Sequence, residues 1–410
     1  MSDDTAAALS LLNAAAVRTR AKRMLALGLD DKLPHFRIDL AQLDHAADLV
    51  AATTRKNYPT LDVPFHSRWR HFTVNGNDRA EILAQRLSDR RERARAAFDL
   101  VIVSVLLDAG AGPRWRYRDA ATSESIGRSE GLALASRDMF VRGAFSSQAD
   151  KNPLRADASV LAQLDTATIA QGFQIAPGNT LVGLEGRATL LRALGELAAS
   201  RPAIFAREDS PRPGGFFDHL AAKADNNTIS APLILSELLQ QFGPIWPSRL
   251  TLGGVPMGDC WRHPALASDD ATSELVPLHK LSQWLAYSLI EPLQRAAFTV
   301  TDIDGLTGLA EYRNGGLFVD GGVLVPRNLA DAARAHEVGD PLVVEWRALT
   351  VALLDRLALA VRARLNRGAA DLPLAKILQG GTWAAGRELA FARRADGSPP
   401  LKIISDGTVF

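Results

Sequence analysis

The chain segment between Leu278 and Arg347 carries polar and aromatic side chains where a simple helical core would have leucine and alanine. These side chains are His279, Lys280, Gln283, Trp284, Tyr287, Glu311, Tyr312, Arg313, Glu345, Trp346 and Arg347. Carboxylates can act as general acids or bases, cationic groups can neutralise an anion, and aromatic rings can wall a flat ligand. The mixture favours a site for a small polar molecule that carries an anionic group.

Residues 277–294, taken as one helix, place polar and apolar side chains on opposite faces. One line holds His279, Gln283, Tyr287 and Glu291, and a line of Leu281, Leu285, Leu289 and Leu293 lies about 200° around the axis. In an average helix the polar line would be a solvated face. Imidazole, amide and phenol groups form directional hydrogen bonds, however, whereas lysine and glutamate usually fill an exposed face. We therefore expect the polar line to face a site.

Two carboxylates occupy unusual places in the expected elements. Glu311 precedes Arg313 and a glycine-rich segment, where the backbone can approach a ligand closely. Asp108 follows an apolar helix, at the end where the helix dipole opposes a negative charge. Asp108 therefore either pairs with an arginine such as Arg114 or serves a ligand.

Glu345 and Arg347 flank Trp346 inside a mostly apolar helix, where they form either a structural salt bridge or part of the site. Four tryptophans stand next to an arginine, namely Trp69, Trp115, Trp261 and Trp346. An indole beside a guanidinium suits a flat ligand with an anionic tail, and equally suits arginine packing over a structural tryptophan. Only the clustering of these pairs favours the ligand.

Motifs for metal and nucleotide binding are missing from the sequence. Cys260 and His263 have the spacing of half a metal site, but no second pair at a suitable spacing follows. The chain has no Gly-x-Ser-x-Gly motif, no phosphate loop and no dinucleotide-binding glycine pattern. The sequence therefore predicts neither a bound metal nor a nucleotide cofactor.

Composition restricts the class of protein. The 410 residues are 47% hydrophobic and 23% charged, enough for one large core or two smaller ones. A net charge of +1 provides no general basic surface for nucleic acid or an anionic membrane. The single cysteine excludes an internal disulfide framework, and residues 1–7 do not read as a secretory signal. The longest apolar run, residues 100–107, is too short to span a bilayer. We expect a cytoplasmic protein.

The hydrophobic periodicity predicts a mainly α fold. Helices are expected over residues 4–27, 40–54, 79–107, 129–140, 158–170, 187–200, 230–242, 277–294, 341–367 and 384–394. A β-hairpin is expected over residues 316–325, around Asp320 and Gly321, and a short strand over residues 402–404. We expect one large helical domain over residues 1–410, with a weak subdomain boundary near residues 202–215.

Five segments carry a resemblance to a known family: residues 253–259, 279–284, 311–318, 344–350 and 405–410. In these segments the chain resembles the uracil-catabolism protein family shared by fungi and bacteria, and the similarity covers essentially the whole chain. The resemblance implies a pathway in which the uracil ring is opened and a ribosylurea-type intermediate appears.

A remoter resemblance involves the queuosine-nucleotide salvage glycosidases, which are helical enzymes similar to DNA glycosylases. Their motifs match Lys280 and Gln283, residues 306–313, and residues 345–348 in the same order. The sequence departs from that family at Glu311, where the family has aspartate, so the reach of the carboxylate is longer by one methylene. This resemblance implies a helical N-glycosidase fold and activity.

Together the resemblances imply a hydrolase that cleaves the ribosyl C–N bond of ribosylurea or its 5′-phosphate. Glu311 would stabilise the oxocarbenium-like state or activate water, with Asp259 and Asp108 as further acids. The expected binding residues are Lys280, Arg313 and Arg347 for a phosphate, Trp261, Trp284 and Tyr312 as walls, Gln283 for the leaving amide, and His279 and Glu345 beside them. Two alternatives remain: an amidohydrolase that attacks the urea group, and a non-catalytic partner of another enzyme of the pathway. The sequence does not define the oligomeric state.

Overall fold

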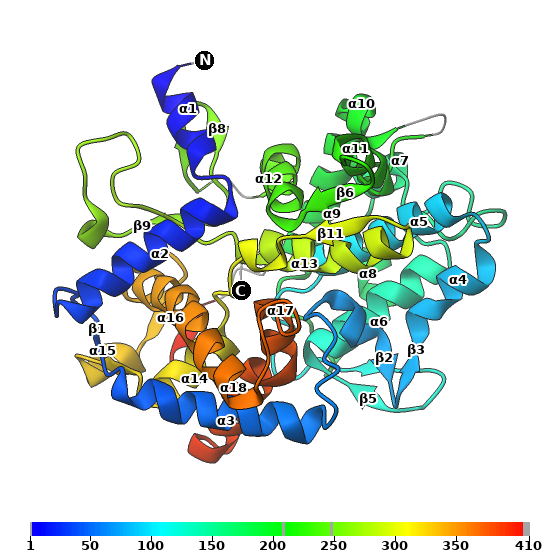
Figure 1. Cartoon of the computed structure of the whole chain (residues 1–410). Helices are drawn as coiled ribbons and strands as arrows, with labels where there is room; N and C mark the ends of the chain where they lie inside the picture. Colours follow the sequence, from blue (N-terminus) through cyan, green and yellow to red (C-terminus); the bar gives the residue numbers. More distant parts are fainter. Residues whose placement is uncertain (1, 207–209, 247–248, 405–410) are drawn as a thin grey trace. The chain divides into compact units, whose positions relative to one another are not determined.

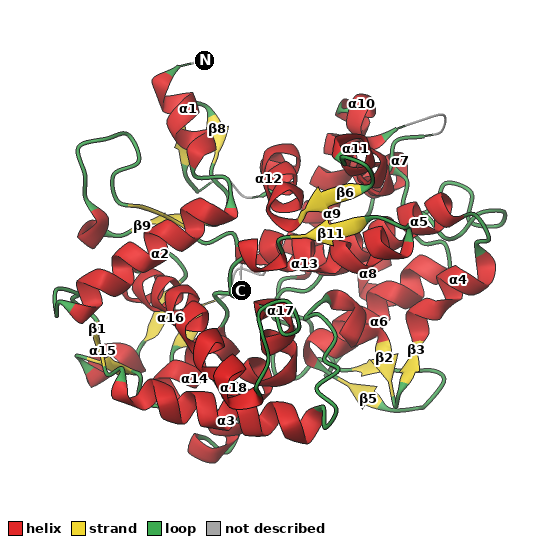
Figure 2. Cartoon of the chain, in the orientation of Figure 1, coloured by secondary structure: helices red, strands yellow, loops and turns green. Residues whose placement is uncertain are grey.

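The computed structural model describes residues 2–206, 210–246 and 249–404, and the chain is mainly helical with small strand pairs (Figure 1 and Figure 2). This confirms the fold class predicted from the hydrophobic periodicity. The described residues form two compact units that are discontinuous in sequence. The first comprises residues 2–66, 249–283 and 302–404, and the second comprises residues 67–206, 210–246 and 284–301. No helix among the described residues combines the length and the apolar character that crossing a bilayer would require.

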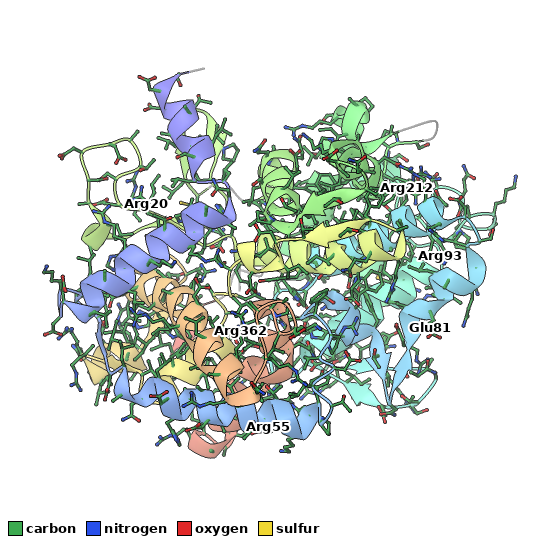
Figure 3. The ribbon with its side chains drawn as sticks, viewed as in Figure 1. Arg20, Arg55, Glu81, Arg93, Arg212 and Arg362 are labelled. Carbon is green, nitrogen blue, oxygen red and sulfur yellow. The ribbon has the colours of Figure 1, made fainter. Side chains whose placement is uncertain are left out.

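The first unit is built around α16 (Pro341–Leu365), which packs against α2 (Ala14–Leu29), α3 (Ala41–Asn57) and α14 (Tyr312–Asp320). Further helices of this unit are α1 (Asp3–Ser10), α15 (Leu329–Ala333), α17 (Leu374–Ile377) and α18 (Trp383–Arg393). Arg362 on α16 is labelled in Figure 3. Its side chain donates to Leu372 O at 2.8 Å and to Asp304 Oδ2 at 2.5 Å. Most of α16 is buried, including its charged residues Glu345 and Arg347.

Strands of the first unit form two-stranded pairs. β1 (Phe36–Ile38) pairs with β12 (Leu324–Pro326), β9 (Cys260–Arg262) with β10 (Leu275–Pro277), and β7 (Thr251–Leu252) with β8 (Val255–Pro256), all antiparallel. β13 (Ala335–Glu337) and β14 (Lys402–Ile404) are parallel. The strand predicted at residues 402–404 is therefore confirmed.

The second unit has the apolar helix α5 (Arg90–Leu106) in its core, packed against α6 (Arg128–Val141), α9 (Leu184–Ser200) and α11 (Phe216–Lys223). Its other helices are α4 (Ile82–Arg86), α7 (Ala158–Ala162), α8 (Thr166–Gly172), α10 (Pro202–Phe205) and α12 (Ala231–Phe242). The parallel strand pair is β6 (Thr228–Ser230) with β11 (Thr299–Thr301). The antiparallel pairs are β2 (Thr73–Val74) with β3 (Asn77–Asp78) and β4 (Tyr117–Arg118) with β5 (Ser125–Ile126). Helix α13 (Lys280–Arg295) begins in the first unit and continues in the second.

Three of the predicted helices are interrupted, each just before an Asn or Asp that caps a new helix. Asn13 accepts a hydrogen bond from Ala16 N, Asp89 from Glu92 N, and Asp165 from Thr168 N. These side chains satisfy backbone donors that an N-terminal turn leaves unpaired, so they favour a new helix start inside an Ala- and Leu-rich run. The other predicted helices are confirmed to within a few residues, apart from residues 277–279, where Pro277 belongs to β10.

The hairpin predicted over residues 316–325 is wrong, because residues 312–320 form α14. The Glu311 side chain accepts hydrogen bonds from Arg313 N and Asn314 N and so caps this helix. Gly315 is required by packing and not by a turn, since a Cβ at this position would lie 2.6 Å from the Trp346 ring. The strand that follows, β12, pairs with β1 and not with residues 316–319.

The single domain predicted over residues 1–410 remains a prediction. The boundary considered near residues 202–215 does not coincide with the limits of either compact unit. The described part of this segment lies within the second unit.

Gly315 and Gly316, which are adjacent in α14, should respond in opposite ways to substitution by alanine. Gly315→Ala should lower the free energy of unfolding by about 1–3 kcal/mol, because the new methyl group overlaps the Trp346 ring. Gly316→Ala should be neutral or stabilising by up to about 1 kcal/mol, because its Cβ would have no neighbour closer than 3.3 Å and alanine favours the helix. Urea unfolding of both variants measures the difference, and an equal loss in both would contradict this packing.

Candidate functional site

Both faces of α13 are buried in the structure, so the polar line is not a solvated face. Gln283 and Tyr287 are 1% and 0% exposed, and the opposing leucines are buried as well. His279 lies just before the helix with φ = 47°, a left-handed conformation that a non-glycine residue adopts only when its surroundings hold it there. Its Nε2 donates to Leu11 O at 3.2 Å, and burial lowers the pKa of His279. His279, Gln283 and Tyr287 of the polar line therefore belong to the interior, whereas Glu291 is partly exposed.

Asp259, in the loop between β8 and β9, joins three parts of the first unit. Its Oδ1 accepts from Arg347 Nη1 at 2.8 Å and from Trp261 Nε1 at 2.7 Å. Its Oδ2 accepts from Arg347 Nη2 at 2.8 Å and from Lys280 N at 2.9 Å, the first residue of α13. Arg347 Nε donates to Ala310 O at 3.2 Å, next to Glu311. One ion pair thus links β9, α13, α16 and the start of α14.

This environment keeps Asp259 ionised. Burial alone would raise the pKa of its carboxyl, but the charge of Arg347 and the hydrogen bonds from Arg347 and Trp261 outweigh it and hold the pKa well below its usual range. The geometry argues against the proton-donor role expected for Asp259. The charge of Arg347, expected at a phosphate, is already paired with Asp259, and its Nε donates to Ala310 O.

Glu311 has the opposite electrostatic environment. Burial raises the pKa of its carboxyl, and the hydrogen bonds from Arg313 N at 2.7 Å and Asn314 N at 2.6 Å, with the charges of Lys280 and Arg313, oppose the rise only in part. Two backbone N–H groups of α14 orient the carboxylate, and the positive charge of Lys280 also acts on it. A buried carboxyl with a raised pKa is typical of a functional site.

Gln283 positions the segment that leads to Glu311. Its Oε1 accepts from Thr307 N at 3.0 Å, and its Nε2 donates to Thr307 Oγ1. Because both ends of the amide are used, the structure favours a positioning role for Gln283 over the expected contact with a leaving group.

The aromatic and basic residues near Asp259 include one that the sequence did not indicate. The guanidinium of Arg249 lies 5.2 Å from the centre of the Trp261 ring, whereas the sequence suggested the adjacent Arg262 as the partner of this ring. Burial lowers the pKa of Arg249, and the charge of Asp259 opposes that shift. Arg313 lies over the Tyr312 ring at 5.0 Å and donates to Gly397 O at 2.8 Å. Arg249 becomes recognisable only in three dimensions.

Asp108 and Trp284 belong to the second unit. Asp108 Oδ1 accepts from Arg68 Nη1 at 2.6 Å, and both of its oxygens accept from Ser129 Oγ. The Arg68 guanidinium also lies 5.6 Å from the centre of the Trp284 ring. The structural pairing considered for Asp108 is therefore present, with Arg68 and not with Arg114 as the partner.

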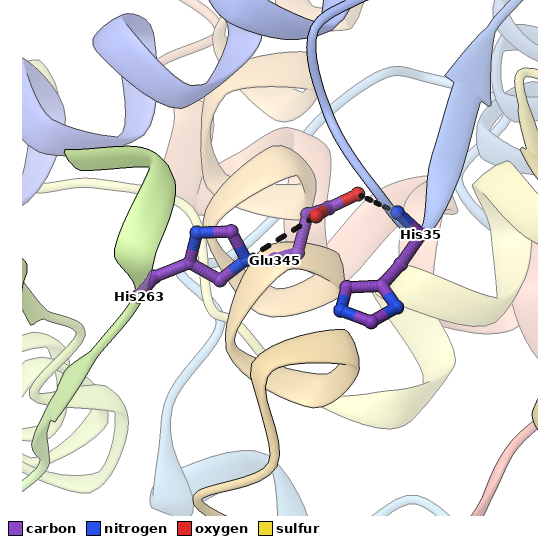
Figure 4. Close-up of side chains that lie close together, drawn as sticks. All are labelled: His35, His263 and Glu345. Atoms are coloured by element: carbon purple, nitrogen blue, oxygen red, sulfur yellow. Dashed lines mark hydrogen bonds and ion pairs between the residues drawn. The ribbon is translucent and has the colours of Figure 1, made fainter.

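Glu345 lies on the side of α16 away from Asp259. Asp259 binds Arg347, and residues two apart on a helix, such as Glu345 and Arg347, point about 200° from each other. Its Oε1 accepts from Phe36 N at 2.8 Å and His35 N at 3.3 Å, and its Oε2 lies 3.2 Å from His263 Nε2 (Figure 4). The salt bridge between Glu345 and Arg347 considered from the sequence is absent from the described interactions, since each has another partner. His35 gave no signal in the sequence, because its partners are hundreds of residues away.

Comparison with known proteins assigns this architecture to a family. The model of the family described as "Protein of unknown function (DUF1688)" matches residues 10–410, and the chain belongs to this family. It is 38% identical over 410 residues to a Lachancea kluyveri protein named "Uracil catabolism protein 4", covering 92% of each chain. It is 39% identical to "Protein urg3" of Schizosaccharomyces pombe, covering 100% of each chain. The resemblance to uracil-catabolism proteins seen in the sequence is confirmed.

The Asp259–Arg347 pair predicts a pH-dependent contribution to stability. Asp259→Asn should cost about 3–5 kcal/mol near neutral pH, because it leaves a buried guanidinium without its counter-charge. Since the pKa of Asp259 is depressed in the folded state, this contribution is complete above the ordinary value of 3.8 and is lost as the pH falls below it. Urea unfolding between pH 3 and pH 7 should show the difference from wild type shrinking only at the acid end.

Asp304→Asn provides a matched control, because Asp304 pairs with another arginine of α16, Arg362, but is 35% exposed. We expect this variant to cost about 1 kcal/mol or less. A pH-independent difference between wild type and Asp259→Asn would show that Asp259 is not held ionised by Arg347.

Proposed function

We propose that this protein hydrolyses the ribosyl C–N bond of ribosylurea, or of its 5′-phosphate, in uracil catabolism. The main support is the geometry of Glu311, a buried carboxyl with a raised pKa, held by two backbone donors beside the Asp259–Arg347 pair. The name of the Lachancea kluyveri relative supports a role in uracil catabolism, and the resemblance of segments within residues 280–348 to N-glycosidases supports the type of bond.

Hydrolysis of an N-ribosyl bond passes through a state with positive charge at the anomeric carbon. The ionised Glu311 stabilises this charge and takes a proton from the attacking water, whose oxygen bonds to the anomeric carbon. The C–N bond breaks as its electrons move to the urea nitrogen, which takes up a proton, so that the products are ribose or ribose 5-phosphate and urea. A carboxyl pKa raised toward the working pH suits a base of this kind.

An amidohydrolase acting on the urea group is the second candidate. The observation that favours it is the group formed by His35, His263 and Glu345, since hydrolysis of urea commonly uses metal-activated water. The two reactions give different products, because attack on the urea carbonyl releases ammonia and leaves no free urea.

Incubation of the pure protein with ribosylurea 5′-phosphate, followed by mass spectrometry, tests the proposal directly. We expect free ribose 5-phosphate and urea in equal amounts from the wild type. Glu311→Gln should lower turnover by about two to four orders of magnitude, because the amide keeps the shape of the carboxylate and removes its charge. The rate of the wild type should rise with pH through an apparent pKa above the ordinary 4.5, and the variant should lack this limb.

Asp89→Asn is the matched control, because it makes the same chemical change at the exposed cap of α5. Its turnover should equal that of the wild type. Ammonia without free urea would identify the amidohydrolase, and a folded Glu311→Gln protein with normal turnover would remove Glu311 from the mechanism. The absence of any product would favour a non-catalytic partner.

Lys280 is one of three residues expected to hold a phosphate; the other two, Arg313 and Arg347, donate to Gly397 O and to Asp259. Lys280→Met should weaken binding of ribosylurea 5′-phosphate to Glu311→Gln protein by about tenfold to a hundredfold and leave binding of ribosylurea nearly unchanged. Calorimetry with both ligands measures the two affinities. Lys32→Met, at an exposed lysine of the same unit, is the control and should change neither. Equal affinities for the two ligands in the parent protein would remove the phosphate from the proposal.

A further inference from the structure

His35, His263 and Glu345 meet in the first unit although they are far apart in sequence (Figure 4). His35 precedes β1, His263 follows β9 and begins a short 3-10 helix, and Glu345 belongs to the first turns of α16. One ligand atom from each residue can be chosen so that all three lie within 4.8 Å of one another. In Figure 4 the two imidazole rings flank the Glu345 side chain.

The distance between His263 and Glu345 fits a shared metal ion. Two ligands that bind a tetrahedral zinc ion at about 2.0–2.1 Å stand about 3.3 Å apart. His263 Nε2 and Glu345 Oε2 are 3.2 Å apart. The His35 ring would have to approach by up to about 1.5 Å to complete this geometry, and this ring is only partly buried.

The two buried atoms also lack other partners. Neither His263 Nε2 nor Glu345 Oε2 has a well-aligned hydrogen bond, although both residues are 0% exposed. The two atoms face each other at 3.2 Å, and a cation bound between them would give both a strong partner. The other Glu345 oxygen accepts from Phe36 N and His35 N, so the carboxylate is already oriented in the way that a metal ligand requires.

We propose that His35, His263 and Glu345 form a binding site for one divalent transition-metal ion, of which zinc is the best match. Two imidazole nitrogens and one carboxylate oxygen suit zinc or a neighbouring first-row ion, whereas Mg²⁺ and Ca²⁺ prefer oxygen ligands alone. The three protein ligands leave a fourth position for water.

One local contact lowers the expected affinity. His263 Nδ1 accepts from Ala265 N at 3.2 Å, so without metal the ring proton is on Nε2 and faces Glu345. A cation bound at Nε2 takes the place of this proton, and the neutral ring then carries its proton on Nδ1. The hydrogen bond from Ala265 N must break, because a protonated Nδ1 cannot accept it. We therefore expect binding about ten- to a hundredfold weaker than at a site whose second histidine nitrogen already donates to an acceptor.

The position of the site indicates what the ion does. Glu345 and Arg347 point to opposite sides of α16, so the metal braces this helix against β1 and β9 from the side away from Asp259. An ion that binds the folded chain through three distant segments stabilises it by mass action. The ion thus cross-links α16 to β1 and β9 on the side of the helix opposite the Asp259–Arg347 pair.

Titration of chelator-treated, full-length protein with ZnCl2 by calorimetry tests the site, with metal content measured by mass spectrometry after gel filtration. We expect one zinc per chain, a Tm that rises with zinc, and no comparable binding of MgCl2. His35→Ala, His263→Ala and Glu345→Gln should each weaken zinc binding at least tenfold and remove the rise in Tm. His45→Ala removes another histidine of the same unit and should bind zinc like the wild type.

His35→Ala is the decisive variant, because the partly exposed ring is not part of the core and its removal should leave the fold intact. Absence of stoichiometric zinc in the wild type, or unchanged binding in folded His35→Ala protein, would overturn the proposal. No substrate enters this experiment, so its outcome is independent of the proposed glycosidase activity.

Discussion

The ion pair between Asp259 and Arg347 is the interaction on which the organisation of the first unit depends. A guanidinium that is 1% exposed is unfavourable without a counter-charge, and the two parallel hydrogen bonds to Asp259 supply it. The same carboxylate accepts from Trp261 and from the backbone of Lys280, while Arg347 donates to Ala310 O. The loop before β9, the start of α13 and the approach to α14 are therefore all positioned against one helix.

This arrangement explains why two buried carboxylates behave differently. Asp259 faces a cation and several donors, so its negative charge is stabilised. Glu311 accepts hydrogen bonds from two backbone N–H groups, and these, with the charges of Lys280 and Arg313, do not outweigh burial, so its pKa rises. Because their pKa values differ in this way, Asp259 stays ionised and stabilises the structure, whereas Glu311 remains able to exchange a proton.

Helix α16 carries different chemistry on its two sides. Its 25 residues are mostly buried, which makes each charged side chain depend on a specific partner. Arg347 finds Asp259, and Glu345 finds His263 and the backbone around His35. Strain or loosening on one side would reach the other through the same helix, because a packed helix moves as a unit.

The sequence by itself determined the helical class, most helix positions and the resemblance to uracil-catabolism proteins. These features are local: hydrophobic periodicity, capping residues and short motifs are written within a few residues of one another. It misassigned residues 316–325 as a hairpin, because Asp320 and Gly321, which suggest a turn between two strands, instead form the C-terminal end of α14. Partners such as Arg68 for Asp108, Arg249 for Trp261 and His35 for Glu345 were decided only by the tertiary structure. Each joins residues from separate elements, and no local pattern records which distant side chain will compensate a buried charge.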